Sequence, residues 1–350
     1  MSVRGGIASA QPAPAKPDPA VVERQLRDAV ARKPDSFKAH QMLAGFYLQQ
    51  HQLAKAIPHL QRAHAINPSH YATGYDLAVA LIQTGQTDAA RTHLKKMLAA
   101  KETGELHNLL GDVEEQAGNS VAAAEEYQTA AHMDPSEEHL FDFGDKLIRM
   151  GMRDEAVKVF TVAVAQHPKS ARLHVGLGIA HYSKGEYADA VTSFCTAVDL
   201  SPEDPRPYQF LGEMYGTAPE LSEEISTRLA NFVKTQPRNA LAHLYYALSL
   251  WKGSGSANAA NLGVVETHLR RAVTIDPRLA KGFFELGVLL SDQQRYTEAI
   301  PELRRAVQLE PSNAQHHYRL ARAYQSTGQR ALAAKELEIF EQLKAAAREK

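Results

Sequence analysis

Residues 37–70 decide the fold, and they read FKAHQMLAGFYLQQHQLAKAIPHLQRAHAINPSH. Apolar and small residues recur in this segment at helical spacing, with Leu43 and Tyr47 in its first half and Ala56 and Leu60 in its second. The segment closes on Asn-Pro, and a proline stops a helix because it lacks the N–H donor and its ring clashes with the preceding turn. It is therefore predicted to form a helix, a turn and a second helix.

Prolines recur along the chain at intervals close to the length of this segment. The series is Pro34, Pro68, Pro135, Pro168, Pro202, Pro237, Pro277 and Pro311. It indicates a unit of about 34 residues, with one proline missing near Glu102. Nine units are predicted, and they begin at Phe37, Tyr71, Gly104, Glu137, Ala171, Pro205, Ala240, Ala280 and Ala314.

Two columns of the alignment of these units predict how their helices pack. When each unit's proline is placed at position 32, position 8 is always small: Ala44, Ala78, Gly111, Gly144, Gly178, Gly212, Ala247, Gly287 and Ala321. Position 24 is always large: Leu60, Leu94, Tyr127, Phe160, Phe194, Leu229, Leu269, Leu303 and Leu337. Large side chains of the second helices are thus predicted to face small residues where the helix backbones approach.

Small residues at positions 8 and 20, a large one at 24 and proline at 32 together resemble the tetratricopeptide repeat, in its bacterial form. The resemblance implies an all-α superhelix of about nine helix–turn–helix repeats over residues 37–345. Residues 18–36 are expected to form an N-terminal half-repeat helix, and residues 346–350 the end of the last helix. Because two short helices cannot bury both of their faces alone, the repeats must stack.

Repeats six and seven, residues 205–279, depart from the pattern. Repeat six carries Pro219, Ile225 and Phe232 where a turn glycine and two small residues are expected, so the helix interface there is predicted to open or rotate. Repeat seven is expected to contain an extra loop, Gly253–Asn261. The loop is interpreted either as a partner-contacting hinge or as a tolerated surface insertion.

Composition and motifs argue against several classes of function. The 350 residues carry a net charge of −1, which disfavours nucleic acid as a partner, and no apolar run is long enough to predict membrane insertion. No catalytic motif is found, so no catalytic residue, no cofactor and no metal site is predicted. The single cysteine, Cys195, is interpreted as a small semi-buried residue.

Five histidines share position 4, where most other repeats have a large apolar or aromatic residue. They are His40, His107, His174, His243 and His317. Their spacing of one or two repeats does not suit metal chelation, so we expect them to fill space in the core. A pH-sensitive array is the alternative.

The resemblance also implies that the first helices line an inner face, at positions 2, 5, 9, 12 and 13. Part of that face is acidic, around Glu105, Asp112 and Glu115, and other parts are apolar. The apolar residues predicted to form a peptide-binding groove are Tyr75, Val79, Ile82, Phe141, Ile148, Val175, Ile179, Tyr182, Leu244, Leu248, Trp251, Phe284 and Val288. The alternative is that some of them pack against neighbouring helices, or that the chain's own tail or last helix covers them.

These observations predict a non-enzymatic scaffold or adaptor that binds a peptide or helix of an unidentified partner protein. The alternative is an accessory subunit of a larger enzyme or cell-envelope complex, held through its outer helix faces. Residues 1–17 are rich in proline and alanine and are expected to be disordered. The chain as written is expected to be cytoplasmic, or periplasmic or secreted if a signal peptide precedes Ala10.

Overall fold

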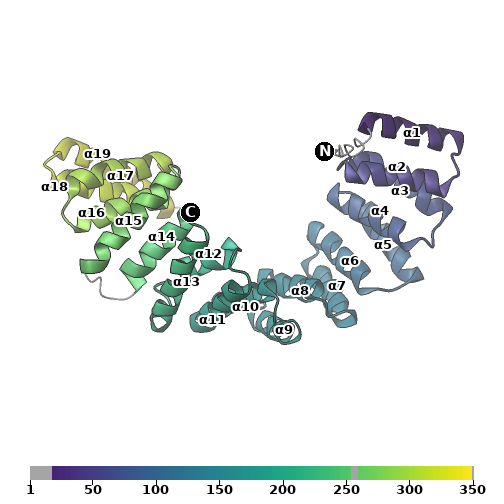
Figure 1. The fold of residues 1–350 in the computed structure, drawn as a ribbon, viewed down its shortest axis with the longest axis horizontal. Helices are drawn as coiled ribbons and strands as arrows, with labels where there is room; N and C mark the ends of the chain where they lie inside the picture. Colours follow the sequence, from purple (N-terminus) through teal and green to yellow (C-terminus); the bar gives the residue numbers. More distant parts are fainter. Residues whose placement is uncertain (1–17, 254–258, 349–350) are drawn as a thin grey trace, which may run out of the picture. The chain divides into compact units, whose positions relative to one another are not determined.

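The computed structural model describes residues 18–253 and 259–348. Within these residues the secondary structure consists of nineteen α-helices, two short helical turns and no strand (Figure 1). The chain divides into two compact units, 1–146 and 147–350, and the boundary falls inside α8. The predicted all-α fold is confirmed, whereas the predicted tail 1–17 lies outside the described residues.

Unit 1 contains α1 to α7 and most of α8. Their bounds are α1 Pro19–Arg32, α2 Phe37–Gln49, α3 Leu53–Ile66, α4 Tyr71–Gln83, α5 Thr87–Ala100, α6 Gly104–Gln116, α7 Ser120–Met133 and α8 Glu137–Arg149. Consecutive helices contact one another from α1 to α7, and α4 also contacts α6, so first helices of neighbouring repeats lie side by side.

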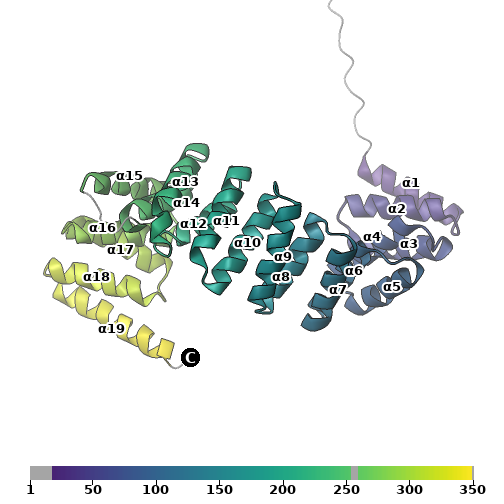
Figure 2. The ribbon, with the colours of Figure 1, turned by 90° about the horizontal axis from the view of Figure 1, so that it is seen from below.

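Unit 2 contains the end of α8 and all later helices. Their bounds are α9 Arg153–Gln166, α10 Ala171–Lys184, α11 Tyr187–Leu200, α12 Pro205–Glu213, α13 Ser222–Thr235, α14 Ala240–Leu248, α15 Ala259–Ile275, α16 Ala280–Asp292, α17 Tyr296–Leu309, α18 Ala314–Ser326 and α19 Arg330–Arg348. Figure 2 shows α16 to α19 lying against one another in sequence order, as their contacts require.

All nine first helices begin at the residue where the proline spacing starts a repeat. Polar side chains cap many of them, as where Ser170 Oγ accepts a hydrogen bond from the backbone N–H of Leu173 at 3.1 Å. Five of the turns between first and second helices contain a left-handed glycine: Gly85, Gly118, Gly151, Gly185 and Gly328 have φ between 71° and 83°. This conformation lets the chain reverse directly after the first helix of those repeats.

Glycine at position 8 gives an aromatic residue at position 24 the space that it needs. A Cβ atom built on Gly178 would lie 2.6 Å from Cε1 of Phe194, and one built on Gly111 would lie 2.7 Å from the ring of Tyr127. Phe194 is fully buried. The predicted packing of large against small residues is therefore direct contact between a ring and a helix backbone.

Repeat six, which carries the bulky residues Ile225 and Phe232, has a shortened first helix. Helix α12 has nine residues and ends at Glu213, and the chain then turns through the short 3₁₀ segment Pro219–Leu221 into α13. Phe232 is fully buried, and its ring stacks on that of Tyr208 with centroids 4.1 Å apart. Helix α12 also contacts α14 directly.

The loop predicted in repeat seven is longer than the structure allows. Helix α14 continues into a π-helical turn, Ser249–Gly253, and α15 begins at Ala259. The prediction that Ala259–Asn261 belongs to the loop is therefore wrong, because these residues, followed by Leu262, extend the second helix. The remaining loop residues, 254–258, lie outside the described part of the chain.

The histidines at position 4 bond to the turn that precedes their own repeat. Nε2 of His40, His174, His243 and His317 lies 3.0 to 3.3 Å from the carbonyl oxygen of the proline six residues earlier. Nδ1 of two of these histidines faces a second histidine, at 3.1 Å between His40 and His59 and at 2.8 Å between His243 and His268. We call this arrangement the histidine tie. It joins the turn between repeats to both helices of the following repeat.

Candidate protein-binding surface

The first helices of unit 1 form a continuous face across α4, α6 and α8. The hydroxyl of Tyr71 on α4 donates to Glu105 Oε2 on α6 at 2.8 Å. The Nδ2 amide of Asn108 on α6 donates to Asp142 Oδ2 on α8 at 3.0 Å. We call this surface the first-helix face of unit 1.

The predicted apolar residues of unit 1 are only partly available to a ligand. Tyr75 and Val79 are half-buried on α4 and pack against the core of the first repeats. Ile82 belongs to that core and is almost fully buried. Phe141 lies half-buried on α8. The structure brings the first three residues together on one helix, with Tyr75 and Val79 as those that keep exposed surface.

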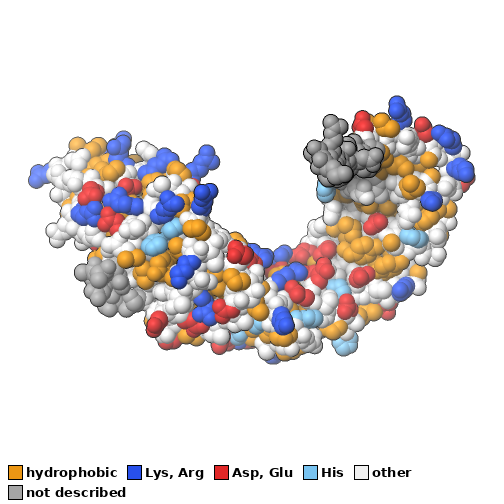
Figure 3. Space-filling view, in the orientation of Figure 1, with side chains coloured by type: hydrophobic (Ala, Val, Ile, Leu, Met, Phe, Trp, Pro, Cys, Tyr) orange, Lys and Arg blue, Asp and Glu red, His pale blue; other side chains and the backbone are white. Residues whose placement is uncertain are grey.

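The same face carries a cluster of carboxylates on α6 and α8, and Figure 3 shows acidic side chains gathered over these helices. Tyr127 Oη donates to Asp112 Oδ1 at 2.7 Å and to Glu115 Oε2 at 3.2 Å. Lys146 Nζ, which is almost fully buried, donates to Glu115 Oε1 at 3.3 Å. Burial and then the negative charges of Asp142, Glu115 and Glu138 raise the pKa of Asp112, although the Tyr127 hydrogen bond opposes this. Asp112 and the neighbouring carboxylates therefore repel one another in a partly buried environment.

In unit 2, α10 carries the next group of predicted residues. Val175 and Ile179 are half-buried and pack against the core of repeats five and six, while Tyr182 is 47% exposed. The ring centroid of Tyr182 lies 5.5 Å from that of Tyr187 on α11. Ile148 is half-buried at the end of α8. Helix α10 thus presents an apolar edge that ends in an exposed aromatic ring.

Two residues predicted to anchor a partner are not on the surface. Leu244 and Leu248 have no exposed area, because they pack into the core formed by α14 to α19. Tyr215 packs against this core as well, and its carbonyl oxygen would lie 3.3 Å from a Cβ atom on Gly253. Since α12 ends at Glu213, the segment around Tyr215 can fold against the π-helical turn. The prediction that these two leucines contact a partner is therefore wrong.

The remaining predicted residues of repeats seven and eight differ in exposure. Trp251 and Phe284 are half-buried and pack against that core, and Val288 is almost fully buried. Lys252 Nζ lies 4.8 Å from the ring centroid of Trp251 and donates to Glu285 Oε2 at 2.5 Å. The rings of Phe284 and His316 lie 4.6 Å apart. Aromatic rings with charged groups at their edges are the common composition of protein-binding sites.

Position 11 of the repeat is polar in two repeats, where it holds Glu114 and His181, and each of these side chains has a polar partner. Glu114 is buried and accepts from Arg91 Nε at 2.7 Å and from Asn119 Nδ2 at 2.7 Å, and the Arg91 bond lowers its pKa. His181 Nδ1 lies 2.7 Å from Glu186 Oε2.

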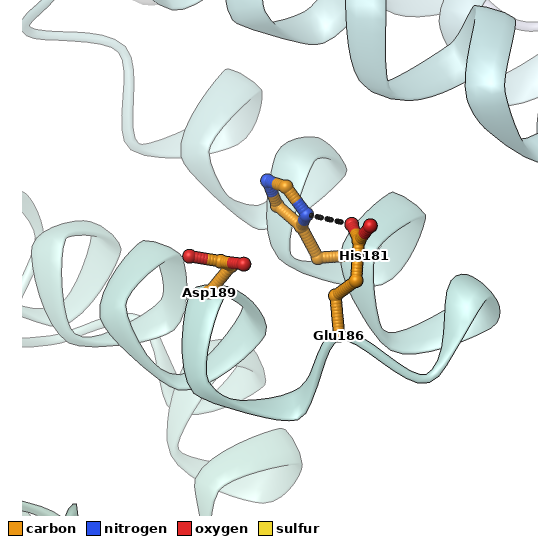
Figure 4. Close-up of side chains that lie close together, drawn as sticks. All are labelled: His181, Glu186 and Asp189. Atoms are coloured by element: carbon orange, nitrogen blue, oxygen red, sulfur yellow. Dashed lines mark hydrogen bonds and ion pairs between the residues drawn. The ribbon is translucent and has the colours of Figure 1, made fainter.

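His181, Glu186 and Asp189 could each offer one ligand atom to a metal ion, with all of these atoms within 4.8 Å of one another. Figure 4 shows the imidazole of His181 beside both carboxylates. Glu186, however, also accepts from Lys184 Nζ at 2.7 Å, and Lys184 and then His181 lower its pKa. The lysine ammonium already supplies the positive charge that a metal would bring, so we interpret the group as an ion-pair network.

Comparison with known proteins agrees with this architecture. Two family models of the tetratricopeptide repeat match the chain, one at residues 47–113 and the other at residues 20–71 and 141–205. The chain belongs to the tetratricopeptide repeat family. A further model, the bacterial transcriptional activator domain, matches residues 221–350 of this repeat protein.

One curated relative and several solved structures are similar to the repeat protein. The relative is the human protein O-mannosyl-transferase TMTC1, 26% identical over 168 residues that cover 46% of this chain and 19% of the relative. The chain thus matches about a fifth of that protein's length. The crystal structure of YrrB, described as a tetratricopeptide repeat protein with an unusual peptide-binding site, is 21% identical and covers 53% of this chain and 96% of YrrB, with a TM-score of 0.42. MamA from Desulfovibrio magneticus RS-1 is 20% identical and covers 51% of this chain and 96% of MamA, with a TM-score of 0.41.

No helix in the described ranges combines the length and the apolar character that crossing a membrane requires.

Proposed function

We propose that this protein is a non-enzymatic interaction scaffold that binds a segment of a partner protein on the first-helix faces of its repeats. The observation that carries the proposal is the row of half-buried aromatic and aliphatic side chains on these helices. Tyr75 and Val79 form it in unit 1, and Trp251 and Phe284 form it in unit 2. Such side chains pack against the core on one side and keep a surface that a ligand can cover.

Covering this surface would supply part of the free energy of binding. Full burial of a large apolar side chain contributes about 1.5 to 3 kcal/mol, and these residues are already about half-buried. The two residues of one unit would together contribute about 1.5 to 3 kcal/mol, before the entropy cost of association is subtracted. Hydrogen bonds at the polar edges, such as those open to Lys252 and Glu285, would add orientation.

A non-enzymatic role agrees with the state of the reactive groups. Burial raises the pKa of the Cys195 thiol to about 12, so at neutral pH it is not a thiolate nucleophile. Glu114 and Glu186 are engaged in ion pairs, and His40 and His243 in histidine ties. The likeness to the human mannosyl-transferase covers 19% of that protein, and we do not carry its activity over to this chain.

Site-specific photo-crosslinking tests the proposal. A benzoylphenylalanine placed at Gln83 or Asp292, which are exposed at the ends of first helices α4 and α16, should crosslink a discrete partner in the source cell. Replacing Phe284 with serine should reduce the crosslink from position 292. The same change at Val162, which is 52% exposed on second helix α9, is the matched control and should leave that crosslink intact. If neither first-helix position gives a crosslink, the proposal is contradicted.

The second candidate function is that of an accessory subunit held through its second helices. Exposed apolar side chains on these helices favour it, with Val121 on α7 65% exposed and Leu332 on α19 45% exposed. A probe at Val162 or Leu332 would then crosslink the partner, while probes at Gln83 and Asp292 would not. Masking of second-helix amides in hydrogen exchange on adding the complex would give the same answer.

A further inference from the structure

We propose that the first-helix face of unit 1 binds an arginine side chain of the partner segment, through Tyr75, Glu105, Asn108, Asp112 and Glu138. We call these five residues the acidic cluster. The proposal rests on the proposed function, since it names the chemistry of a segment that would lie on the same face.

The members of the acidic cluster come together because of helical spacing and repeat stacking. Glu105, Asn108 and Asp112 are separated by three and four residues on α6, so they share one side of that helix. Tyr75 and Glu138 occupy the neighbouring first helices α4 and α8. The ring of Tyr75 stacks on that of Tyr71, with centroids 6.2 Å apart, and the Tyr71 hydroxyl donates to Glu105. Burial raises the pKa of the Tyr75 phenol, and the negative charges of Glu105, Glu138 and Asp112 raise it further.

Two of these carboxylates are bonded to neutral groups that leave their charge uncompensated. Glu105 accepts from the Tyr71 hydroxyl at 2.8 Å, and Asp112 accepts from the Tyr127 hydroxyl at 2.7 Å. Glu105 and Glu138 are exposed, whereas Asp112 is partly buried. A cationic ligand would relieve the repulsion between these groups.

The surrounding sequence is strongly acidic as well. Residues 71–146, the part of unit 1 from repeat two onward, contain 14 aspartates and glutamates against 5 lysines and arginines. A segment with positive charge is therefore attracted to this face before it makes contact.

Asn108 supplies a second observation that points to a hydrogen-bond donor. Its side chain is 7% exposed, and its Nδ2 group is used by Asp142. Its Oδ1 atom is buried and has no hydrogen-bond partner. Buried polar atoms in native proteins are nearly always paired, so this carbonyl oxygen is an unused acceptor that a small shift of the Asn108 side chain would open to an N–H donor of the ligand.

Arginine fits this group better than lysine. A guanidinium is planar, can lie on the ring of Tyr75, and offers five N–H donors at its edge. Those donors match carboxylate oxygens on two helices together with the Asn108 oxygen. A lysine ammonium has one centre of charge and three donors, and it cannot stack on the ring in the same way.

The test uses labelled hexa-arginine and hexa-lysine peptides and the full-length protein, with binding measured by fluorescence anisotropy at low ionic strength. We expect hexa-arginine to bind at least about threefold more tightly than hexa-lysine. The double variant Glu105→Gln and Glu138→Gln should weaken hexa-arginine binding about tenfold. The matched control, Asp28→Asn and Glu125→Gln, changes the net charge equally at exposed positions on α1 and α7, and should weaken it less than about twofold.

A further variant, Tyr75→Ala, should remove the preference for arginine over lysine while leaving the helical circular dichroism unchanged. Equal losses in the two double variants, or equal binding of the two peptides to the wild-type protein, would overturn the proposal. So would a salt-sensitive self-association in sedimentation that the Glu105→Gln and Glu138→Gln variant abolishes, because the face would then be occupied by a second copy of the chain.

Crosslinking separates failure of this proposal from failure of the proposed function. If the probe at Gln83 crosslinks a partner but hexa-arginine does not compete with the crosslink, the function stands and the arginine site is wrong. If probes at Gln83 and Asp292 crosslink nothing, the proposed function itself is wrong, whatever the peptides do.

Discussion

Gly178→Ala isolates the contact between position 8 and position 24. An alanine Cβ at this position would lie 2.6 to 2.8 Å from three ring atoms of Phe194, about 1 Å closer than van der Waals contact. Phe194 is fully buried and stacks on Phe210 with centroids 4.7 Å apart, so its ring cannot move aside. Overpacking of this kind costs about 1 to 3 kcal/mol, and the higher helix propensity of alanine returns about 1 kcal/mol. We expect a net loss of up to about 2 kcal/mol in the free energy of unfolding.

The sequence itself supplies the compensating change. Four repeats combine alanine at position 8 with leucine at position 24, namely Ala44 with Leu60, Ala78 with Leu94, Ala247 with Leu269 and Ala321 with Leu337. Phe194→Leu alone should cost about 1 to 2 kcal/mol through the lost ring packing. In the Phe194→Leu background, Gly178→Ala should stabilise the protein by up to about 1 kcal/mol, since the clash is gone and the propensity gain remains.

Urea unfolding followed by circular dichroism measures the four proteins of this cycle. The predicted coupling between the two changes is about 1 to 3 kcal/mol, which is the overpacking cost that only the phenylalanine imposes. Gly263→Ala is the control: this glycine is exposed within α15 and a Cβ there meets nothing within 4 Å, so the change should stabilise by about 0.5 to 1 kcal/mol. Additivity of the two changes within about 0.5 kcal/mol, or stabilisation by Gly178→Ala alone, would refute the reasoning.

Three further predictions concern buried polar groups. Burial lowers the pKa of His243 and His268, so the unfolded chain binds more protons near pH 6. The stability that these two residues contribute should be complete above the unfolded pKa of about 6.5 and should fall as the pH drops below it. His268→Gln should therefore reduce the fall in melting temperature between about pH 7.5 and about pH 5.5. Arg91→Ala should lower the free energy of unfolding by about 2 kcal/mol because it leaves Glu114 buried and unpaired, and the double change with Glu114→Gln should recover part of this loss in the same urea assay. Cys195 should react with a disulfide reagent only under denaturing conditions, since burial raises the pKa of its thiol to about 12; rapid modification of the native protein would contradict its buried placement.

The start of every first helix could be predicted from the sequence because the signals are local and repeated. A proline, a capping side chain and the apolar spacing lie within one repeat, and each repeat presents them again. Pairs such as Gly178 and Phe194 follow for the same reason, since both columns were visible in the alignment of the repeats. The wrong assignments, Leu244 and Leu248, lie where the pattern breaks. Their burial depends on the early end of α12 and on Tyr215 folding against the π-helical turn. The residues of repeat seven alone do not predict either feature.

The acidic cluster was partly visible in the sequence and partly hidden. Glu105 and Asp112 fall in the positions that a first helix exposes, and their charge could be read directly. That the Oδ1 atom of Asn108 lacks a partner could not, because it depends on which neighbour takes the Nδ2 group. Satisfaction of a hydrogen-bonding group is a property of the assembled helices, and a residue's type and position do not determine it.

The histidine tie determines which nitrogen of each ring carries a hydrogen, and NMR can detect this. A carbonyl oxygen can only accept, so Nε2 of His40 must carry the hydrogen that it donates to Pro34. In the neutral pair Nδ1 of His40 is then an acceptor, and His59 must donate from its own Nδ1. The two rings are therefore locked in opposite tautomers, and the pair of His243 and His268 repeats this arrangement. The imidazole ¹⁵N resonances of these four residues should separate into two tautomeric sets, each reporting from inside a junction between repeats.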